Sequence, residues 1–441
     1  MPMRRENSYE NCLKTMYGLH RFGIKLGLAT IRKILKGLGN PQKRFACIHV
    51  AGTNGKGSVA SSLASILYRS GFTTGLYTSP HLVSFNERIQ INNHPISDDR
   101  VVAAYNAVTG VHHGRRDPTF FEFATAMALY EFGRQQVDWA VIETGMGGRL
   151  DATNIIIPEL SIITNVSLEH QAYLGNTISL IAGEKAGIIK PRKPVVTAVR
   201  QKSACEVVEK TAAEKKAPVY RLRRDFKIRR HPSGTFSYYG LANDWHNLQT
   251  ALRGSHQADN AALVLAVCEL LNAKKADLTL DDIKKGLSTN YWPGRLETVS
   301  RDPLIILDGA HNRAAADNLA RFLANNLAGL ALTLVIGILD DKPYKAMLKS
   351  LLPLSSRVIL TRAKIDRALN PQKLMEVTQN YNIESTIVPD VAGAIKHAVD
   401  TNPPQGAICV AGSLYVVGEA KEALDKGLLR GHVSSSTAMH I

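Results

Sequence analysis

Short apolar runs alternate with segments of helical spacing along this 441-residue chain. Residues 28–38 illustrate the helical spacing, since Leu28, Ile31 and Leu35 fall on one face. A further amphipathic helix is expected near residues 8–19. The runs typical of buried strands lie at residues 45–50, 73–77, 138–143, 160–166 and 194–199. This alternation predicts a parallel sheet covered by helices on both faces.

The same alternation restarts after the sequence Trp292-Pro293-Gly294-Arg295. Apolar runs follow at residues 304–307, 332–336, 357–361, 385–388 and 407–410, with helical segments between them. A chain of this length exceeds one ordinary hydrophobic core. We therefore expect two α/β domains, residues 1–297 and a smaller, doubly wound domain at residues 298–441.

Composition describes a globular protein, with 45% hydrophobic and 21% charged residues. No apolar run is long enough to span a bilayer, and no signal peptide is recognised, so we expect no membrane association and a cytoplasmic location. The five cysteines are scattered without a Cys-x-x-Cys pair, which argues against zinc and against a disulfide framework.

The net charge of +16 favours an anionic partner. Much of the excess lies in residues 190–230, and within it residues 221–230 alternate charged and apolar side chains as in a hairpin with one solvated face. No pattern of a nucleic-acid-binding module accompanies this charge. We therefore favour a solvated face for this segment, with attraction for a polyanionic small molecule as the functional alternative. A nucleic-acid-binding ATPase is the alternative from another class.

A glycine-rich loop follows the first strand and opens a helix. Glycines let the backbone approach an anion, the helix N-terminus attracts it, and a lysine and a hydroxyl add a cation and a ligand for phosphate or Mg²⁺. Two fewer residues separate the glycines than in the usual P-loop, and a plain strand-to-helix turn is the alternative. The residues expected to bind phosphate are Gly52, Thr53, Asn54, Gly55, Lys56, Gly57 and Ser58.

Two candidate metal ligands follow neighbouring strand runs. Glu143 ends the run at 138–143 and opens a glycine-dense turn, and His170 lies just beyond the run at 160–166. Because strand carboxyl ends form the ligand crevice of an open α/β sheet, both side chains should lie near the phosphate loop. A carboxylate there suits Mg²⁺. Alternatively, Glu143 caps its own turn and His170 is a packed or surface residue.

Three further groups carry weaker signals. Lys185 beside Mg²⁺ is unfavourable unless it reaches phosphate or has become an anionic carbamate, and charge considerations alone make it a surface residue. In the second domain, Asp308 and His311 stand where a strand gives way to a helix, and Arg295 precedes that strand. A helix cap or a surface charge is the alternative for each.

The sequence as a whole resembles the folylpolyglutamate synthase family, including its bacterial bifunctional dihydrofolate synthase members, within the Mur ligase superfamily. The resemblance spans nearly the whole chain. Its motifs lie at residues 49–58, 79–82, 85–89, 143–154, 183–188, 256–260, 293–295, 307–312, 341–342 and 412–413.

The resemblance implies an α/β fold with a P-loop, parallel-sheet ATP-binding domain and a smaller Rossmann-like C-terminal domain. It implies ATP contacts from Asn260, Arg295 and Asp308, and two Mg²⁺ sites formed by Ser79, Glu143, His170 and Lys185. Lys185 matches the family's carbamylated lysine. The implied catalytic residues are Lys56, Lys185 and His170. The implied substrate residues are Thr119, Phe120, Phe121, Glu122, Leu150, Asp151 and Ala152 for pteroate, and His311 and Ser413 for glutamate.

The activity that follows is ATP-dependent ligation of L-glutamate to dihydropteroate and to the γ-carboxylate of reduced folates, through an acyl phosphate. A folylpolyglutamate synthase without the first activity and another Mur-type amino-acid ligase are the alternatives among enzymes. The expected partners are ATP, L-glutamate, dihydropteroate and reduced folates, and the expected state is a monomer.

Overall fold

The computed structural model describes residues 8–19, 27–112, 116–274 and 276–428. The chain divides into two compact units. The first runs to Ala251 and includes Gln257–Tyr291, and the second comprises Leu252–His256 and the chain from Trp292. Residue 298, where the sequence analysis divides the domains, lies inside a strand of the second unit. Among the described helices, none is both long and apolar enough to cross a bilayer.

The first unit is built on an eight-stranded sheet with the order β4-β3-β2-β5-β1-β6-β7-β8. The six strands from β2 to β8 in this order are parallel, whereas β3 and β4 are antiparallel at one edge. The five predicted strands are confirmed. The strands are β1 (Ala46–Ala51), β2 (Thr74–Tyr77), β3 (Ile89–Ile91), β4 (His94–Pro95), β5 (Trp139–Glu143), β6 (Leu160–Ile163), β7 (Val195–Thr197) and β8 (Val219–Arg221).

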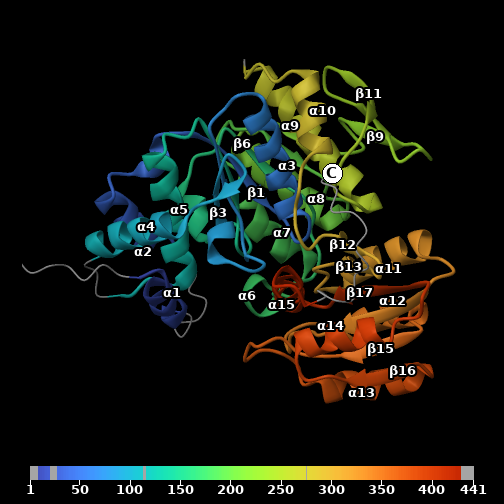
Figure 1. The fold of residues 1–441 in the computed structure, drawn as a ribbon. Helices are drawn as coiled ribbons and strands as arrows, with labels where there is room; N and C mark the ends of the chain where they lie inside the picture. The colour runs from blue at the N-terminus through green and yellow to red at the C-terminus, as the bar shows by residue number, and fades with distance from the viewer. Residues whose placement is uncertain (1–7, 20–26, 113–115, 275, 429–441) are drawn as a thin grey trace, which may run out of the picture. The chain divides into compact units, whose positions relative to one another are not determined.

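Helices pack on both faces of this sheet (Figure 1). The Phe132 ring of α5 lies against Gly75 of β2, where a Cβ atom would come within 2.7 Å of it. Within this unit, α10 packs on α3. The helices are α1 (Tyr9–Gly18), α2 (Ala29–Gly37), α3 (Lys56–Arg69), α4 (Asp98–Val111), α5 (Phe120–Arg134), α6 (Gln171–Leu174), α7 (Ile178–Ala186), α8 (Lys202–Glu214), α9 (Ser255–Asn272) and α10 (Leu280–Ser288).

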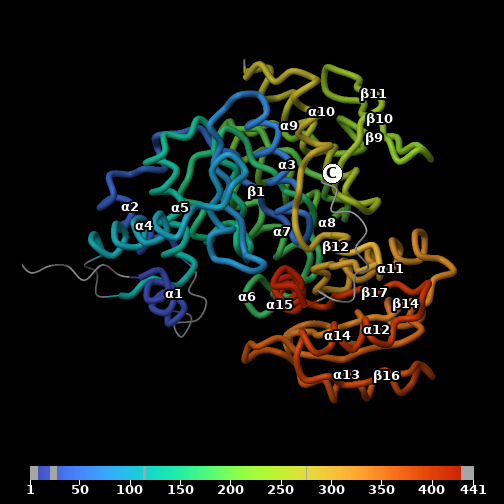
Figure 2. Tube along the Cα trace, in the orientation of Figure 1, coloured from blue at the N-terminus to red at the C-terminus, as the bar shows by residue number. Residues whose placement is uncertain are grey.

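A small antiparallel sheet made of β9 (Lys227–Arg230), β10 (Phe236–Tyr239) and β11 (Asp244–Leu248) accompanies the large one (Figure 2). Glu269 of α9 anchors it, because this buried carboxylate accepts hydrogen bonds from the Tyr238 hydroxyl at 2.6 Å and from the backbone N–H of Asn243 at 2.7 Å. The hairpin expected within residues 221–230 is therefore wrong. That segment divides between β8 and β9, and β9 pairs with β10.

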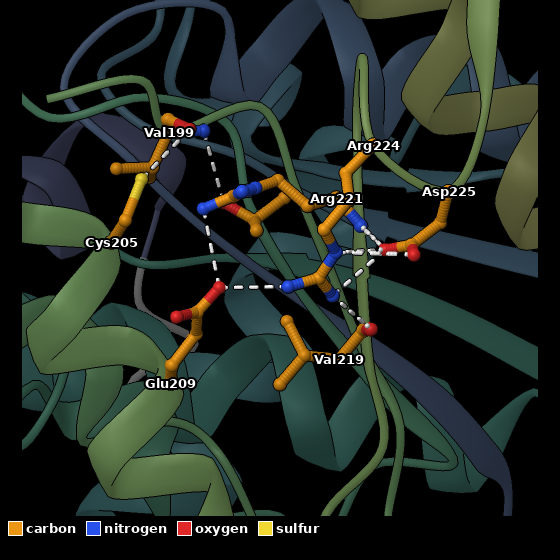
Figure 3. A network of polar contacts seen from close by, with 8 residues as sticks. Val199, Cys205, Glu209, Val219, Arg221, Arg224 and Asp225 are labelled. Atoms are coloured by element: carbon orange, nitrogen blue, oxygen red, sulfur yellow. Dashed lines mark hydrogen bonds and ion pairs between the residues drawn. The ribbon is translucent and has the colours of Figure 1, made fainter. Parts of the chain in front are cut away.

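The basic residues of this region are partly neutralised by neighbouring carboxylates (Figure 3). Glu209 accepts hydrogen bonds from Arg221 at 3.2 Å and from Arg224 at 2.8 Å. Asp225 accepts from the Arg221 backbone N–H at 2.7 Å and from the Arg224 guanidinium at 3.0 Å. The charge run is thus an ion-pair network at the end of β8, which weakens the case for a nucleic-acid surface.

The second unit has a six-stranded sheet with the order β12-β13-β17-β14-β15-β16. All five predicted strands are confirmed, and β12 is an additional antiparallel edge strand. The strands are β12 (Glu297–Arg301), β13 (Leu304–Leu307), β14 (Ala331–Ile336), β15 (Arg357–Leu360), β16 (Glu384–Ile387) and β17 (Gly406–Ala411). The helices are α11 (Arg313–Asn326), α12 (Tyr344–Leu351), α13 (Pro371–Thr378), α14 (Val391–Asp400) and α15 (Leu414–Asp425).

The contact between α10 and α3 predicts the effect of a single methyl group. A Cβ atom at Gly286 would lie 2.5 Å from Ile66 Cγ1 and 2.7 Å from Ile66 Cα. Gly286→Ala should therefore force the helices apart and cost about 1–3 kcal/mol of stability, seen as a lower Tm in thermal unfolding. Gly110→Ala is the matched control, because nothing lies within 4 Å of its Cβ position on α4. Equal Tm values for the two variants would contradict this packing.

Candidate functional site

The loop between β1 and α3 depends on two glycines with positive φ, Gly52 at 152° and Gly55 at 84°. A Cβ atom at Gly52 would lie 1.8 Å from Thr164 Oγ1, and one at Gly55 would lie 2.7 Å from Asn260 Oδ1. Both glycines are therefore required by close approach as well as by backbone conformation. This places Asn260 of α9 directly against the phosphate loop, as the sequence predicts.

The segment after β6 holds the loop in shape. The backbone N–H of Thr53 donates to the backbone carbonyl of Asn165 at 3.0 Å. The backbone N–H of Asn54 donates to the side-chain Oδ1 of Asn165, also at 3.0 Å. The Thr164 hydroxyl donates to the Asn54 carbonyl at 2.7 Å. These bonds hold the loop up to Asn54, and the first N–H groups of a helix such as α3 are suited to an anion.

The side chains of Lys56, at the start of α3, and Glu143, at the end of β5, lie close together. Lys56 Nζ lies 3.8 Å from Glu143 Oε1 and 3.2 Å from the Thr53 carbonyl oxygen. The Glu143 side chain is only 6% exposed. Its Oε2 accepts a hydrogen bond from the backbone N–H of Ser79 at 3.3 Å, so Ser79 lies beside this carboxylate. The structure thus brings together Lys56, Glu143 and Ser79, which the sequence analysis names as candidates for binding phosphate and metal.

These residues fit Mg²⁺ by the chemistry of their donors. Glu143 and Ser79 offer the hard oxygen atoms that Mg²⁺ prefers, and Mg²⁺ sites usually take only one or two carboxylates together with phosphate oxygens and water. Accordingly, no cluster of three His, Cys, Asp or Glu side chains is found within the described residues. Thr144 Oγ1, beside Glu143, is buried and has no hydrogen-bond partner in the part of the chain described.

Lys185 is buried, with 3% of its surface exposed, so the expectation of a surface residue is wrong. The pKa of Lys185 is lowered to about 7, mainly by burial and also by the charge of Lys56, while Glu169 and Asp151 act in the opposite direction. The amine therefore lies within electrostatic reach of the phosphate-loop lysine. Tertiary packing, which the sequence pattern did not reveal, causes the burial.

That packing is a close contact between α7 and the turn after β5. A Cβ atom at Gly148 would lie 2.7 Å from the Glu184 carbonyl oxygen, and one at Gly187 would lie 2.5 Å from Arg149 Cα. The Arg149 backbone N–H donates to the Glu184 carbonyl at 2.7 Å. Two glycines thus allow the helix that carries Lys185 to lie against the turn that follows Glu143.

Asp151 organises the same turn. It is buried, and it accepts the backbone N–H of Met146 at 2.8 Å and that of Thr153 at 3.0 Å. Burial raises the pKa of Asp151, while hydrogen bonds from Thr153 and Met146 act in the opposite direction. Leu150 precedes it and Ala152 follows it at the start of a short 3₁₀ helix, η4 (Ala152–Ile155).

His170 lies in the left-handed region, with φ of 50°, immediately before α6. Its ring is 35% exposed, and Nε2 lies 3.8 Å from Glu169 Oε1. It therefore belongs to the segment after β6, as predicted, and remains accessible to a ligand. Glu169, which acts electrostatically on Lys185, was missed by sequence reasoning, although it stands next to His170.

The first predicted pteroate segment begins α5. Thr119 and Glu122 form a reciprocal capping box, with Glu122 Oε2 accepting the Thr119 backbone N–H at 2.8 Å. Phe120 stacks on Tyr17 with ring centroids 5.6 Å apart, and the Arg88 guanidinium lies 5.1 Å from the Phe120 centroid. Thr119 and Glu122 thus shape the helix end, and Phe120 is buried in the hydrophobic core, with 6% of its surface exposed.

Phe121 lies closer to the metal-side residues. Its ring would come within 2.5 Å of a Cβ atom at Gly145, in the turn after Glu143. The two predicted pteroate segments, 119–122 and 150–152, are therefore linked through this turn.

Another residue that sequence reasoning missed is Gln257 of α9. Its Nε2 donates to Ser58 Oγ at 3.3 Å, and its Oε1 accepts from Asn260 Nδ2 at 2.9 Å. Gln257 joins two predicted ATP residues, and its only sequence signal was its place inside the 256–260 motif.

The predicted residues of the second unit gather at the carboxyl ends of the adjacent strands β13 and β17. Asp308 accepts the backbone N–H of Leu296 and of Ala310, each at 3.0 Å. Burial raises the pKa of Asp308, and the positive charge of Arg295 lowers it. Arg295 lies directly over Gly309, where a Cβ atom would be 2.2 Å from Nη1.

The remaining two residues flank this group. His311 Nδ1 lies 2.8 Å from the Gly309 carbonyl oxygen. Ser413 caps α15, since its Oγ accepts the Val416 N–H at 3.1 Å, and the preceding Gly412 N–H donates to Ala310. Arg295, Asp308, His311 and Ser413 therefore form one group within the second unit.

Comparison with known proteins agrees with this arrangement. The model of the Mur ligase middle domain matches residues 50–268, and that of the dihydrofolate synthetase C-terminal domain matches residues 294–423. The dihydrofolate synthase/folylpolyglutamate synthase of Bacillus subtilis is 36% identical over 95% of this chain and 99% of its own length. The dihydrofolate synthetase of Saccharomyces cerevisiae is 33% identical over 90% and 97%.

Solved structures agree as well. The structure described as E. coli FolC in complex with DHPP and ADP matches with a TM-score of 0.87 and 28% identity, over 94% of this chain and 98% of that one. Mycobacterium tuberculosis folylpolyglutamate synthase, complexed with ADP and AMPPCP, matches with a TM-score of 0.86 and 32% identity over the same shares. The chain therefore belongs to the dihydrofolate synthase/folylpolyglutamate synthase family of the Mur ligase superfamily, whose members are ATP-dependent amide-forming ligases.

Proposed function

We propose that this enzyme joins L-glutamate both to dihydropteroate and to the γ-carboxylate of reduced folates. The observation that carries the proposal is the meeting of Lys56, Glu143 and the buried Lys185 at one end of the sheet, in a chain 36% identical to a bifunctional relative. Chain extension alone and another Mur-type ligation remain the alternatives.

A carboxylate is a poor acylating agent because oxide is a poor leaving group. Transfer of the ATP γ-phosphoryl group to the acceptor carboxylate gives an acyl phosphate, the glutamate amine attacks its carbonyl carbon, and phosphate leaves. The protein's share in phosphoryl transfer is positioning and charge stabilisation. Lys56 and the N–H groups of α3 would supply both, and Ser58, held by Gln257, would bind a phosphate oxygen or the metal.

Mg²⁺ would neutralise charge on the phosphates. Glu143 and Ser79 would hold it, with His170 as a further ligand and a second ion nearby. Lys185 would assist this site as a carbamate, an anion formed when its neutral amine adds CO₂. Burial favours that chemistry, because it suppresses the ammonium form, and the carbamate would meet Lys56 as an opposite charge.

Asn260, which lies against the phosphate loop, would contact ATP. The ATP contacts of Arg295 and Asp308, and the glutamate contacts of His311 and Ser413, stay predictions for the second unit. Residues 119–122 and 150–152 would contact the pteroate. The net charge of +16 suits substrates that are all anionic. A monomeric state and a cytoplasmic location stay predictions.

The substrate experiment measures ADP release with ATP, Mg²⁺ and glutamate, comparing dihydropteroate with tetrahydrofolate. Release with both acceptors supports the bifunctional enzyme, and release with tetrahydrofolate alone leaves chain extension only. Stimulation by nucleic acid without glutamate would favour the ATPase alternative instead.

Lys56→Ala should lower ligation by about 100-fold or more, because the transferring phosphoryl group loses its positioned cation. Steady-state phosphate release with either acceptor measures this. Lys285→Ala is the control, since Lys285 is exposed and pairs with Asp281 on α10. Unimpaired turnover of Lys56→Ala, with circular dichroism like the wild type, would reject the phosphate role.

Glu143→Gln should raise the Mg²⁺ concentration needed for half-maximal activity, since an amide oxygen binds the ion more weakly than a carboxylate. Magnesium titrations at saturating ATP measure the change. Glu159→Gln removes a carboxylate that pairs with Lys193 and Lys274 instead, and should leave the titration unchanged. A magnesium titration of Glu143→Gln identical to that of the wild type would exclude Glu143 as a metal ligand.

Carbamate at Lys185 should be visible as a ¹³C NMR signal after incubation with ¹³C-bicarbonate. With a pKa of about 7, the neutral amine rises from about one tenth at pH 6 to about nine tenths at pH 8, so labelling should increase with pH. Lys185→Met should lack the signal. If active wild-type enzyme at pH 8 gave no such ¹³C signal, Lys185 would be an unmodified amine.

A further inference from the structure

A hydrogen-bonded relay runs from the phosphate-loop strand to the turn after β5. His49, in β1, is completely buried, and its Nε2 lies 2.8 Å from Thr153 Oγ1. Thr153 Oγ1 in turn lies 2.5 Å from Asp151 Oδ1. Because a carboxylate only accepts, the Thr153 hydroxyl donates to Asp151 and accepts from His49 Nε2–H. The direction of both bonds is thereby fixed.

Stability does not explain why a histidine occupies this place. Burial lowers the pKa of His49 to about 3, so the ring is neutral, and its proton is on Nε2. Nδ1 is then an acceptor, and it has no hydrogen-bond partner among the described residues. A buried acceptor left unsatisfied costs free energy, whereas an apolar side chain of similar size would avoid that cost. His49 therefore fits a role in orientation better than one in stabilisation.

The group at the far end of the relay is the one that shapes the turn. Asp151 binds the backbone N–H groups of Met146 and Thr153, so its orientation sets the path of residues 146–153. At the near end, Val50, next to His49, pairs with Glu143 in the parallel sheet. The relay thus adds a side-chain link between β1 and the far side of the turn that Glu143 opens.

We propose that His49 is a positioning residue that acts through Thr153 to orient Asp151 and the acceptor-binding turn relative to the phosphate-loop strand. This inference rests on the proposed function, because residues 150–152 are the proposed pteroate contacts. It assigns to His49 an effect on acceptor binding. ATP binding should be spared, because the loop beyond β1 is held independently by Asn165.

The decisive variant is His49→Leu, which removes the donor and the unsatisfied acceptor together. Its Tm should equal or exceed that of the wild type, while KM for dihydropteroate rises about fivefold or more, the change expected from one lost buried hydrogen bond. KM for ATP should stay within about twofold, since the bonds from Asn165 are untouched. His49→Gln, which restores an N–H donor at similar reach, should recover the acceptor KM.

Thr153→Val breaks both bonds of the relay and should raise the acceptor KM at least as much. Thr197→Val is its matched control, because Thr197 is an equally buried threonine on β7 whose hydroxyl donates to the Ile163 carbonyl at 2.7 Å. The control should lower Tm and leave both KM values unchanged.

Three outcomes would overturn the proposal: an unchanged acceptor KM in His49→Leu, a parallel rise of both KM values with a fall in Tm, or a failure of His49→Gln to restore the acceptor KM. Wild-type protein inactive with every acceptor would instead contradict the proposed function. In that case ¹⁵N NMR of histidine-labelled protein still tests the hydrogen-bonded relay. A neutral Nε2–H ring at about pH 5–8 supports it, and a protonated ring or an Nδ1–H tautomer overturns it.

Discussion

The parallel pairing of β5, β1 and β6 is the constraint on which the first unit's site depends. Val50 of β1 lies opposite Glu143 of β5 on one side and Ile162 of β6 on the other. Because the three strands run in one direction, their carboxyl ends place three loops side by side. The loop after β6 holds the phosphate loop in shape through Asn165. Donors held in this way need little reorganisation when charge develops on a phosphate.

Electrostatics inside this framework couple two lysines to three carboxylates. The charge of Lys56 lowers the pKa of Lys185, whereas Glu169 and Asp151 raise it, and Glu143 Oε1 lies 3.8 Å from Lys56 Nζ. On the surface, Arg221 and Arg224 are paired with Glu209 and Asp225. These arginines are therefore already partly neutralised, which weakens the case for a nucleic acid.

The sequence predicted most of the buried strands, because continuous apolar runs identify them. It missed β8, β9, β11 and β12, whose residues are mostly intermediate or exposed, and also the short, buried β10. The hairpin assigned to residues 221–230 failed for the same reason, since alternating charge does not reveal which strand a segment pairs with. Short strands at a sheet edge obtain their stability from tertiary contacts, and local periodicity does not record those contacts.

The residues of the candidate site were likewise predicted where the sequence signal is local and missed where it is not. The phosphate loop could be predicted, because its glycines, Lys56 and Ser58 are contiguous and each has a local reason. The burial of Lys185 could not, because it arises where Gly148 and Gly187 let α7 approach a turn that is distant in sequence. Gln257 and His49 were overlooked for a related reason, since each acts through a hydrogen bond to a side chain about 100 or more residues away.

The turn after Glu143 connects these separate groups. Through Gly145 it contacts Phe121, through Gly148 it contacts α7, and through Asp151 it is bonded toward β1. Residues that share one backbone segment do not respond independently, so substitutions at these contacts should be non-additive in their effects. A change that moves the turn would alter the acceptor surface, the lysine and the metal-side carboxylate together. The glycines in this turn thus let α5 and α7 pack against the segment that follows Glu143, although none of them carries a reactive group.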